Sequence, residues 1–146
     1  MRWILCALFV AISFTASAEQ DVNQCLLDAA KRYAVSPRLL WSIAKVESGF
    51  NPRATNINTN GSMDIGLMQI NTGWLPTLSR YGITRDHLFD PCVSLYVGAW
   101  VMAQNIQRHG PTLKALGAYN AVDPDKQLRY VRKVLAAVDK SYEKRP

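Results

Sequence analysis

Apolar residues recur every three to four positions along most of the chain, and this period predicts a mainly helical fold. Ser36-Pro37, Asp90-Pro91 and Asp123-Pro124 each place a capping side chain directly before a proline, which is typical of a helix start. Glycines follow the first two of these segments, where they are placed to end a helix. The three helices that we expect from these signals cover about residues 38–48, 91–109 and 124–142.

Weaker signals predict three more helices. The first begins at Asp21 or Asn23, and two short ones cover about residues 75–81 and 113–120. The helix that starts behind Asp90 has the longest apolar stripe, so we expect it to be the central buried helix. The stripe expected on the last helix consists of Leu128, Val131, Leu135, Val138 and Tyr142.

Residues 51–64 interrupt the helical pattern with a polar stretch rich in asparagine. Asn60-Gly61 is the strongest turn signal in the chain. We expect a loop or a small β-hairpin here, which would bring Asp64 back toward the end of the 38–48 helix. An apolar segment, residues 66–70, follows directly.

Glu47 occupies a position where the apolar stripe of the 38–48 helix should continue, after Leu40, Ile43 and Ala44. A carboxyl group on such a face loses water, which disfavours its charged form and raises its pKa. A carboxylic acid that is still protonated near neutral pH can donate a proton to a leaving group. Alternatively, Glu47 marks a frayed helix end and faces solvent or a nearby cation.

Asp64 follows Glu47 by seventeen residues and lies in a polar stretch. One acid in a dry place and one in a wet place is the arrangement that cleavage of a glycosidic bond requires. The alternative for Asp64 is a turn residue that accepts hydrogen bonds from backbone amides beside Asn60-Gly61.

The first eighteen residues have the pattern of a secretory signal. Arg2 is their only charge, an apolar run follows, and Ala16-Ser17-Ala18 supplies the small residues of a cleavage site. We expect residues 1–18 to be a signal peptide and 19–146 to form one exported, soluble domain. An uncleaved membrane anchor is the alternative.

Cys25 and Cys92 remain after such a cleavage, because Cys6 would leave with the signal peptide. An even pair of cysteines in an oxidising compartment predicts a disulfide, with two buried thiols as the alternative. His87 and His109 are isolated, so we expect neither a metal site nor a cofactor.

The formal net charge is +6, and the excess lies near the end of the chain. A solvated basic helix face explains it, and attraction to an anionic polymer or membrane surface is the other interpretation. Nucleic acid is not expected, because the chain has no recognisable binding motif. The late cations are Lys126, Arg129, Arg132, Lys133, Lys140, Lys144 and Arg145.

Four short motifs occur in the order found in family-1 lytic transglycosylases, the lysozyme-like enzymes that cut bacterial peptidoglycan. The motifs are Glu47-Ser48-Gly49-Phe50, Gly66-Leu67-Met68-Gln69, Ala118-Tyr119-Asn120 and Tyr130. The chain resembles this family over nearly all of residues 25–142. The resemblance implies a lysozyme-like, mainly α (α+β) fold with a small β-hairpin or loop region and one disulfide.

The resemblance also implies roles for these residues. Glu47 matches the catalytic acid, and Tyr130 matches a tyrosine whose hydroxyl points toward that acid. Loop stabilisation is the alternative for Gln69 and Asn120, and we expect Trp74 and Trp100 to belong to the core rather than to contact sugar. The residues for which the resemblance implies substrate contacts are Ser48, Met68, Gln69, Tyr119, Asn120 and Tyr130.

Two positions depart from the family pattern. Val122 stands where a glycine is usual, which changes the loop after Asn120. Asp64 precedes Gly66 as in c-type lysozymes, in which an aspartate at this place is the second catalytic carboxylate. The site therefore resembles a hybrid of the two groups.

Within the family, the chain looks most like small exported enzymes that accompany type III and type IV secretion, conjugation and invasion. We therefore expect a monomeric periplasmic enzyme that cuts the β-1,4 bond between N-acetylmuramic acid and N-acetylglucosamine in peptidoglycan strands. A type III or type IV secretion apparatus is the expected partner. Three alternatives remain: a lysozyme-type hydrolase, a non-catalytic glycan-binding module, and a docking component of the apparatus.

Overall fold

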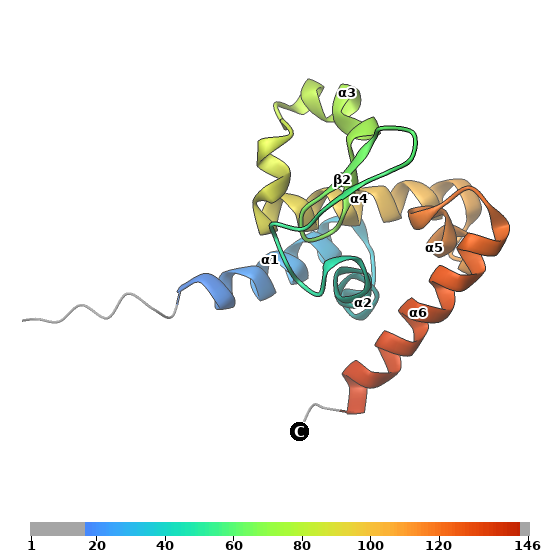
Figure 1. Ribbon diagram of the computed structural model, residues 1–146. Coiled ribbons are helices and arrows are strands. Elements are labelled where there is room, and N and C mark those ends of the chain that lie inside the picture. The colour runs from blue at the N-terminus through green and yellow to red at the C-terminus, as the bar shows by residue number, and fades with distance from the viewer. Residues whose placement is uncertain (1–16, 144–146) are drawn as a thin grey trace, which may run out of the picture.

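A computed structural model of the protein describes residues 17–143 and confirms the expected helical fold with a small sheet. Figure 1 shows α4 crossing the molecule behind the sheet, with α6 descending along one side. The α-helices are α1 (Ser17–Tyr33), α2 (Pro37–Ser48), α3 (Leu75–Leu78), α4 (Pro91–His109), α5 (Leu113–Asn120) and α6 (Pro124–Glu143). The 3-10 helices are η1 (Thr72–Trp74), η2 (Ser79–Tyr81) and η3 (Asp86–Phe89).

The local start and stop signals are confirmed at α2 and α4. The Ser36 hydroxyl accepts a hydrogen bond from the Leu39 amide, and the Asp90 carboxylate accepts one from Val93. Gly49 ends α2 in the left-handed conformation that glycine adopts most readily. The expected start of α1 at Asp21 or Asn23 is wrong, because α1 already begins at Ser17.

The polar stretch forms a hairpin of β1 (Thr55–Ile57) and β2 (Met63–Ile65), as expected. A third strand, β3 (Ile70–Asn71), pairs antiparallel with β2 and was not expected from the sequence. In this register Asp64 pairs with Asn56 on one side and with Asn71 on the other. The sheet therefore surrounds Asp64 with the amide side chains of both neighbouring strands.

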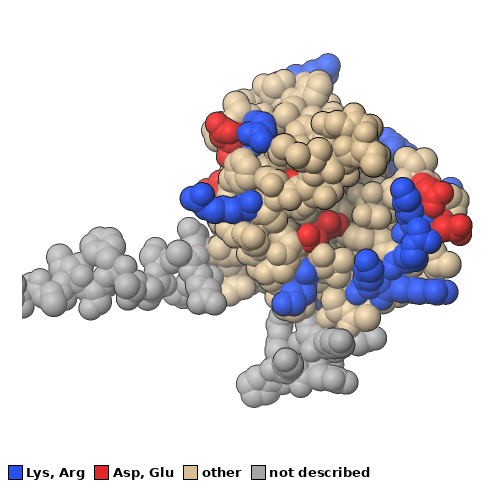
Figure 2. All heavy atoms as spheres, in the orientation of Figure 1, with Lys and Arg blue, Asp and Glu red and all other residues tan. Residues whose placement is uncertain are grey.

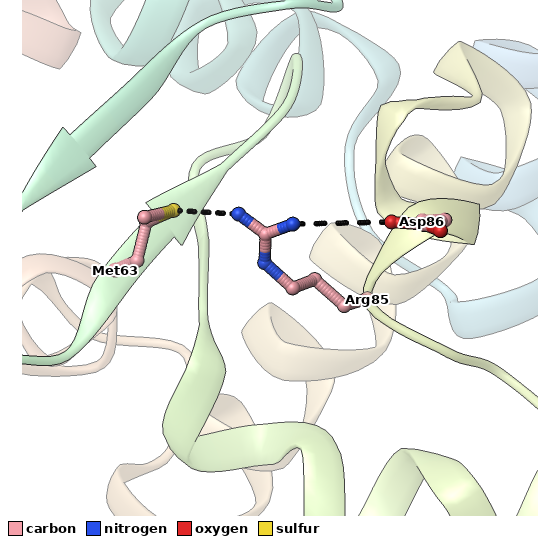
Figure 3. Close-up of polar contacts among 3 residues, drawn as sticks. All are labelled: Met63, Arg85 and Asp86. Atoms are coloured by element: carbon pink, nitrogen blue, oxygen red, sulfur yellow. Dashed lines mark hydrogen bonds and ion pairs between the residues drawn. The ribbon is translucent and has the colours of Figure 1, made fainter.

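The sheet is tied to the segment that follows α3 through Arg85 (Figure 3). The guanidinium donates a hydrogen bond to the Met63 thioether sulfur at 3.3 Å, and its other nitrogen lies 3.9 Å from the Asp86 carboxylate. Both contacts are solvent-exposed, so they contribute little to the free energy of unfolding. They connect the end of β2, next to Asp64, to η3.

The core lies between α1, α2, α4 and the loop that joins β2 to β3. Leu40, Ile43, Leu67, Met68 and Leu95 are almost completely buried in it. The Cys25–Cys92 disulfide is present and joins α1 to α4 with a Cα–Cα distance of 5.3 Å. Within the described residues, no helix is long and apolar enough to cross a membrane. Residues 1–16 of the expected signal peptide lie outside the described part of the chain.

The expected apolar stripe of α6 is confirmed at Val131 and wrong at Leu128 and Leu135. Tyr130, Val131 and Val134 are buried, whereas Leu128 and Leu135 are about half exposed. The buried face is therefore rotated toward Tyr130. Tyr142 lies in the part of α6 whose side chains are not described.

Candidate active site

Glu47 lies in the last turn of α2, on the face that Leu40, Ile43 and Ala44 bury completely. The Tyr130 hydroxyl donates a hydrogen bond of 2.5 Å to its Oε1 atom. Burial, and secondarily the negative charge of Asp64, raise the pKa of Glu47 from 4.5 to about 7, although the Tyr130 bond opposes this rise. Glu47 therefore holds its proton up to neutral pH and can act as an acid.

Tyr130 reaches Glu47 from α6, and its ring stacks on that of Tyr119 from α5. The two ring planes are 7° apart and their centroids are separated by 6.4 Å. The Tyr119 hydroxyl donates a 2.9 Å hydrogen bond to the Met68 carbonyl oxygen. Burial and the charge of Glu47 raise the pKa of both phenols, so both hydroxyls stay protonated donors. The stacked pair thus connects the acid to the loop between β2 and β3.

Asp64 is held by three side-chain amides. Asn71 Nδ2 donates to Oδ1 at 2.7 Å, while Asn56 and Asn58 donate to Oδ2 at 3.3 and 3.1 Å. The side chain is half-buried in β2, outside the turn at Asn60-Gly61. Donors on both oxygens fix the orientation of the carboxyl group.

The three asparagines were not singled out as site residues from the sequence. The polar run that holds Asn56 and Asn58 was interpreted as turn chemistry, which also explains asparagine, and Asn71 lies outside that run. The signal was the spacing: Asn56 and Asn58 are two residues apart, which is the period of one strand face, although β1 itself ends between them at Ile57. Strand pairing, which that spacing does not reveal, directs this face to Asp64.

The loop of residues 66–69 is so closely packed that two glycines next to it or within it leave no room for a side chain. A Cβ on Gly66, whose φ is +78°, would lie 2.1 Å from the Leu88 carbonyl oxygen. A Cβ on Gly98 of α4 would lie 2.6 Å from the Met68 methyl carbon. These two glycines allow the loop to pack directly on η3 and α4.

Polar side chains fix the same loop in place. The Ser48 hydroxyl donates a 2.7 Å hydrogen bond to the Leu67 carbonyl, and the Met68 amide donates a 3.0 Å bond to the Ser94 hydroxyl. Gln69 has a positive φ of 50°, which is unusual for a residue other than glycine. Its side-chain amide donates to the carbonyls of Ala54 and Gly66 at 3.1 and 2.9 Å. Ser94 was not expected from the sequence.

The structure brings both expected catalytic acids close to Tyr119 and Tyr130, because the Asp64 charge acts on Glu47 and both acids act on Tyr119. Two of the residues expected to contact substrate differ sharply in exposure. The Met68 side chain is fully buried, whereas Asn120 at the end of α5 is exposed.

Trp74 and Trp100 form a T-shaped pair with centroids 5.2 Å apart and are partly buried against the core. Their mutual packing accounts for these two aromatic residues without a sugar ligand.

The architecture is that of a lysozyme-like protein: a helical domain with a small antiparallel sheet, in which a sheltered acid lies near a second carboxylate. The Transglycosylase SLT domain family matches residues 24–138, so the chain belongs to that family. By class it is a peptidoglycan lytic transglycosylase.

The chain is also similar to two curated bacterial proteins. The chain is 35% identical to the invasion protein IagB of Salmonella typhimurium over 86% of its own length and 82% of that protein. It is 40% identical to the protein IpgF of Shigella flexneri over 66% of its length and 64% of that protein.

Among solved structures, an inactive mutant of the lytic transglycosylase Slt from Pseudomonas aeruginosa superposes with a TM-score of 0.66 at 22% identity. The match covers 90% of this chain but only 25% of Slt, and it shows a shared fold.

Proposed function

We propose that Glu47 cuts the β-1,4 bond between N-acetylmuramic acid and N-acetylglucosamine by acting first as an acid and then as a base. Its proton passes to the leaving glycosidic oxygen while the bond from that oxygen to the muramic C1 breaks. The Glu47 carboxylate then takes the proton of the muramic 6-hydroxyl, whose oxygen bonds to C1. The product is a 1,6-anhydro sugar, and no water is consumed. The observation that carries this proposal is the Glu47 pKa of about 7 beside the Tyr130 hydroxyl.

Asp64 assists by stabilising the positive charge that develops on the sugar ring. Its support is the set of three amide donors that hold the carboxylate in one orientation near Glu47. The same position suits a hydrolase in which Asp64 helps water to attack the sugar, so hydrolysis is the second candidate reaction.

The remaining expected residues divide between positioning and contact. Four of them position the site through the hydrogen bonds described above. Tyr130 orients Glu47, and the loop is fixed by Ser48, Gln69 and Tyr119. Met68 contributes its backbone. Asn120 is exposed and is the amide available for a direct contact with the glycan.

The test is to digest purified peptidoglycan and to measure the mass of the released muramic ends by mass spectrometry. Transglycosylation gives ends one water lighter than those from a hydrolase. Glu47→Gln should abolish release and Asp64→Asn should lower its rate by at least about a hundredfold, as expected for loss of charge stabilisation. Asp86→Asn, which removes an exposed carboxylate outside the site, is the control. Normal release by Glu47→Gln would refute the acid assignment, and a near-normal rate for Asp64→Asn would return Asp64 to a structural role.

We also propose that the protein is exported to the periplasm and opens the wall for a secretion or conjugation apparatus. The support is its similarity to proteins named for invasion and the signal-like pattern of residues 1–18. Fractionation of cells should find mature protein beginning at residue 19 in the periplasm. Pull-down with apparatus proteins then tests docking separately, since a docking component without activity would bind them but release no sugar.

A further inference from the structure

Three cations on α6 have no function in the mechanism above. Lys126, Arg129 and Lys133, here called the cationic strip, are all exposed. Within the described residues, none of the three forms an ion pair. Their charges are therefore available to a ligand, although Asp125 lies one turn before Arg129 and weakens its field.

The strip borders the face of α6 that reaches the active site. At about 100° per residue, Lys126 and Lys133 lie about 40° and 60° from Tyr130, and Arg129 about 100°, all on one side of it. Val131 and Val134, which are buried, lie on the other side. Figure 2 shows Lys and Arg side chains gathered over α6, on the same face of the molecule where acidic atoms are visible in a central hollow.

The other faces of α6 differ from the strip, because one packs on α5 and another exposes apolar side chains. Gln127 packs on Gly117 of α5, since a Cβ on that glycine would lie 2.7 Å from the Gln127 Cβ. Leu128 and Leu135 are about half exposed and lie about 160° and 140° from Tyr130. The strip is therefore a polar margin of the site and not part of an amphipathic membrane-binding face.

We infer that the cationic strip binds the carboxylates of the peptide substituents on the glycan strand. The inference rests on the proposed function. The sugars of the strand are neutral when the lactyl group of muramic acid is in amide linkage, so the backbone alone gives these cations no counter-charge. The peptides attached at that group carry free carboxylates and lie next to the bond that Glu47 would cut. Lysine and arginine beside Tyr130 are placed to bind them.

The test measures binding without turnover, in a Glu47→Gln background, by co-sedimentation with purified sacculi free of attached acidic polymers. One batch of sacculi is untreated, and in the other the peptide carboxylates are converted to amides. Lys126→Gln/Lys133→Gln should bind untreated sacculi about tenfold more weakly, at roughly threefold per charge-assisted contact. It should bind amidated sacculi as well as the parent does.

Lys31→Gln/Arg80→Gln, which removes the same charge from exposed positions on α1 and η2, is the matched control and should bind like the parent. The inference is overturned if the control loses as much, if the strip variant binds normally, or if it loses equally on amidated sacculi. It is also overturned if strip-dependent binding is found on anionic phospholipid vesicles instead of sacculi. Failure of the proposed chemistry would appear separately, as no sugar release by the protein with Glu47 intact.

Discussion

The proton on Glu47 is controlled by neighbours that act in opposite directions. Burial and the Asp64 charge favour the neutral acid, and the Tyr130 hydroxyl favours the carboxylate. Burial has the largest effect, so the pKa reaches about 7. An enzyme that needs first an acid and then a base is served well by a pKa near the working pH.

Removing the Tyr130 hydroxyl should raise the pKa of Glu47, because the hydrogen bond that stabilises its carboxylate is lost. Asp64→Asn should lower that pKa, because a nearby negative charge is removed. The alkaline fall of kcat/KM, near pH 7 in the parent, should therefore move up in Tyr130→Phe and down in Asp64→Asn. Titration of a labelled Glu47 carboxyl by NMR gives the same two shifts even where activity is lost. Shifts of equal sign would contradict this assignment of causes.

The same burial affects stability. The folded-state pKa of Glu47 lies above its unfolded value of 4.5, so its contribution to stability is complete below pH 4.5 and is lost as pH rises through about 7. Glu47→Gln keeps the hydrogen-bond acceptor and has no charge to bury. We expect it to unfold with a free energy up to about 3 kcal/mol higher than the parent at pH 8. Urea denaturation at pH 4 and pH 8 measures the difference, which should nearly vanish at pH 4.

At the scale of elements, local sequence signals were sufficient to predict where a helix begins and ends. They were not sufficient to predict which face of a helix is buried by contacts with distant segments. Ser36, Pro37 and Gly49 define α2 by themselves, and the periodicity of α2 placed Glu47 on its buried face. The stripe of α6 was predicted from the spacing of its apolar residues, which includes the buried Val131 but also the half-exposed Leu128 and Leu135. The buried face is instead centred on Tyr130, whose partners Glu47 and Tyr119 lie on other helices.

The amide donors of Asp64 illustrate the same limit. Asn56 and Asn71 meet it only through the register of three strands, one of which was not expected. Asparagine-rich segments are read as turns unless that register is known. The sequence therefore predicted the two acids and the approach of Tyr130 to Glu47, whereas the amide donors that orient Asp64 became visible only in the structure.

Packing of the loop on α4 gives a prediction at this scale. Gly98→Ala places a methyl group 2.6–2.9 Å from three atoms of Met68, so the loop or the helix must move. We expect a loss of about 1–3 kcal/mol in the free energy of unfolding, and a lower kcat because the Met68 carbonyl anchors Tyr119. In a double-mutant cycle with Met68→Ala, the combined loss should be smaller than the sum of the two single losses. If the two losses in the free energy of unfolding are strictly additive, the added methyl group and the Met68 side chain are not in steric conflict.

At the scale of the whole molecule, we expect the disulfide to affect the free energy of unfolding and not the geometry of the active site. The Cys25–Cys92 bridge spans 67 positions and closes a loop that contains Glu47 and Asp64, while Tyr119 and Tyr130 lie outside it. The two acids are positioned by their own contacts with α6 and the sheet, none of which involves the cysteines. Losing the bridge should therefore enlarge the unfolded ensemble without moving the site.

Cys25→Ala/Cys92→Ala should lower the free energy of unfolding by about 4 kcal/mol, the chain-entropy value for a loop of this length. For a domain of this size the melting temperature should fall by about 15 °C. At temperatures well below the new transition, kcat should stay within about twofold of the parent. A displaced catalytic group that raised the activation free energy by about 1.4 kcal/mol would already lower kcat tenfold. Thermal melts with and without reductant measure the first effect, and the variant, which has no bridge to reduce, should not respond to reductant. A variant that melts normally, or one that is folded but inactive, would show that the bridge instead holds the acids in place.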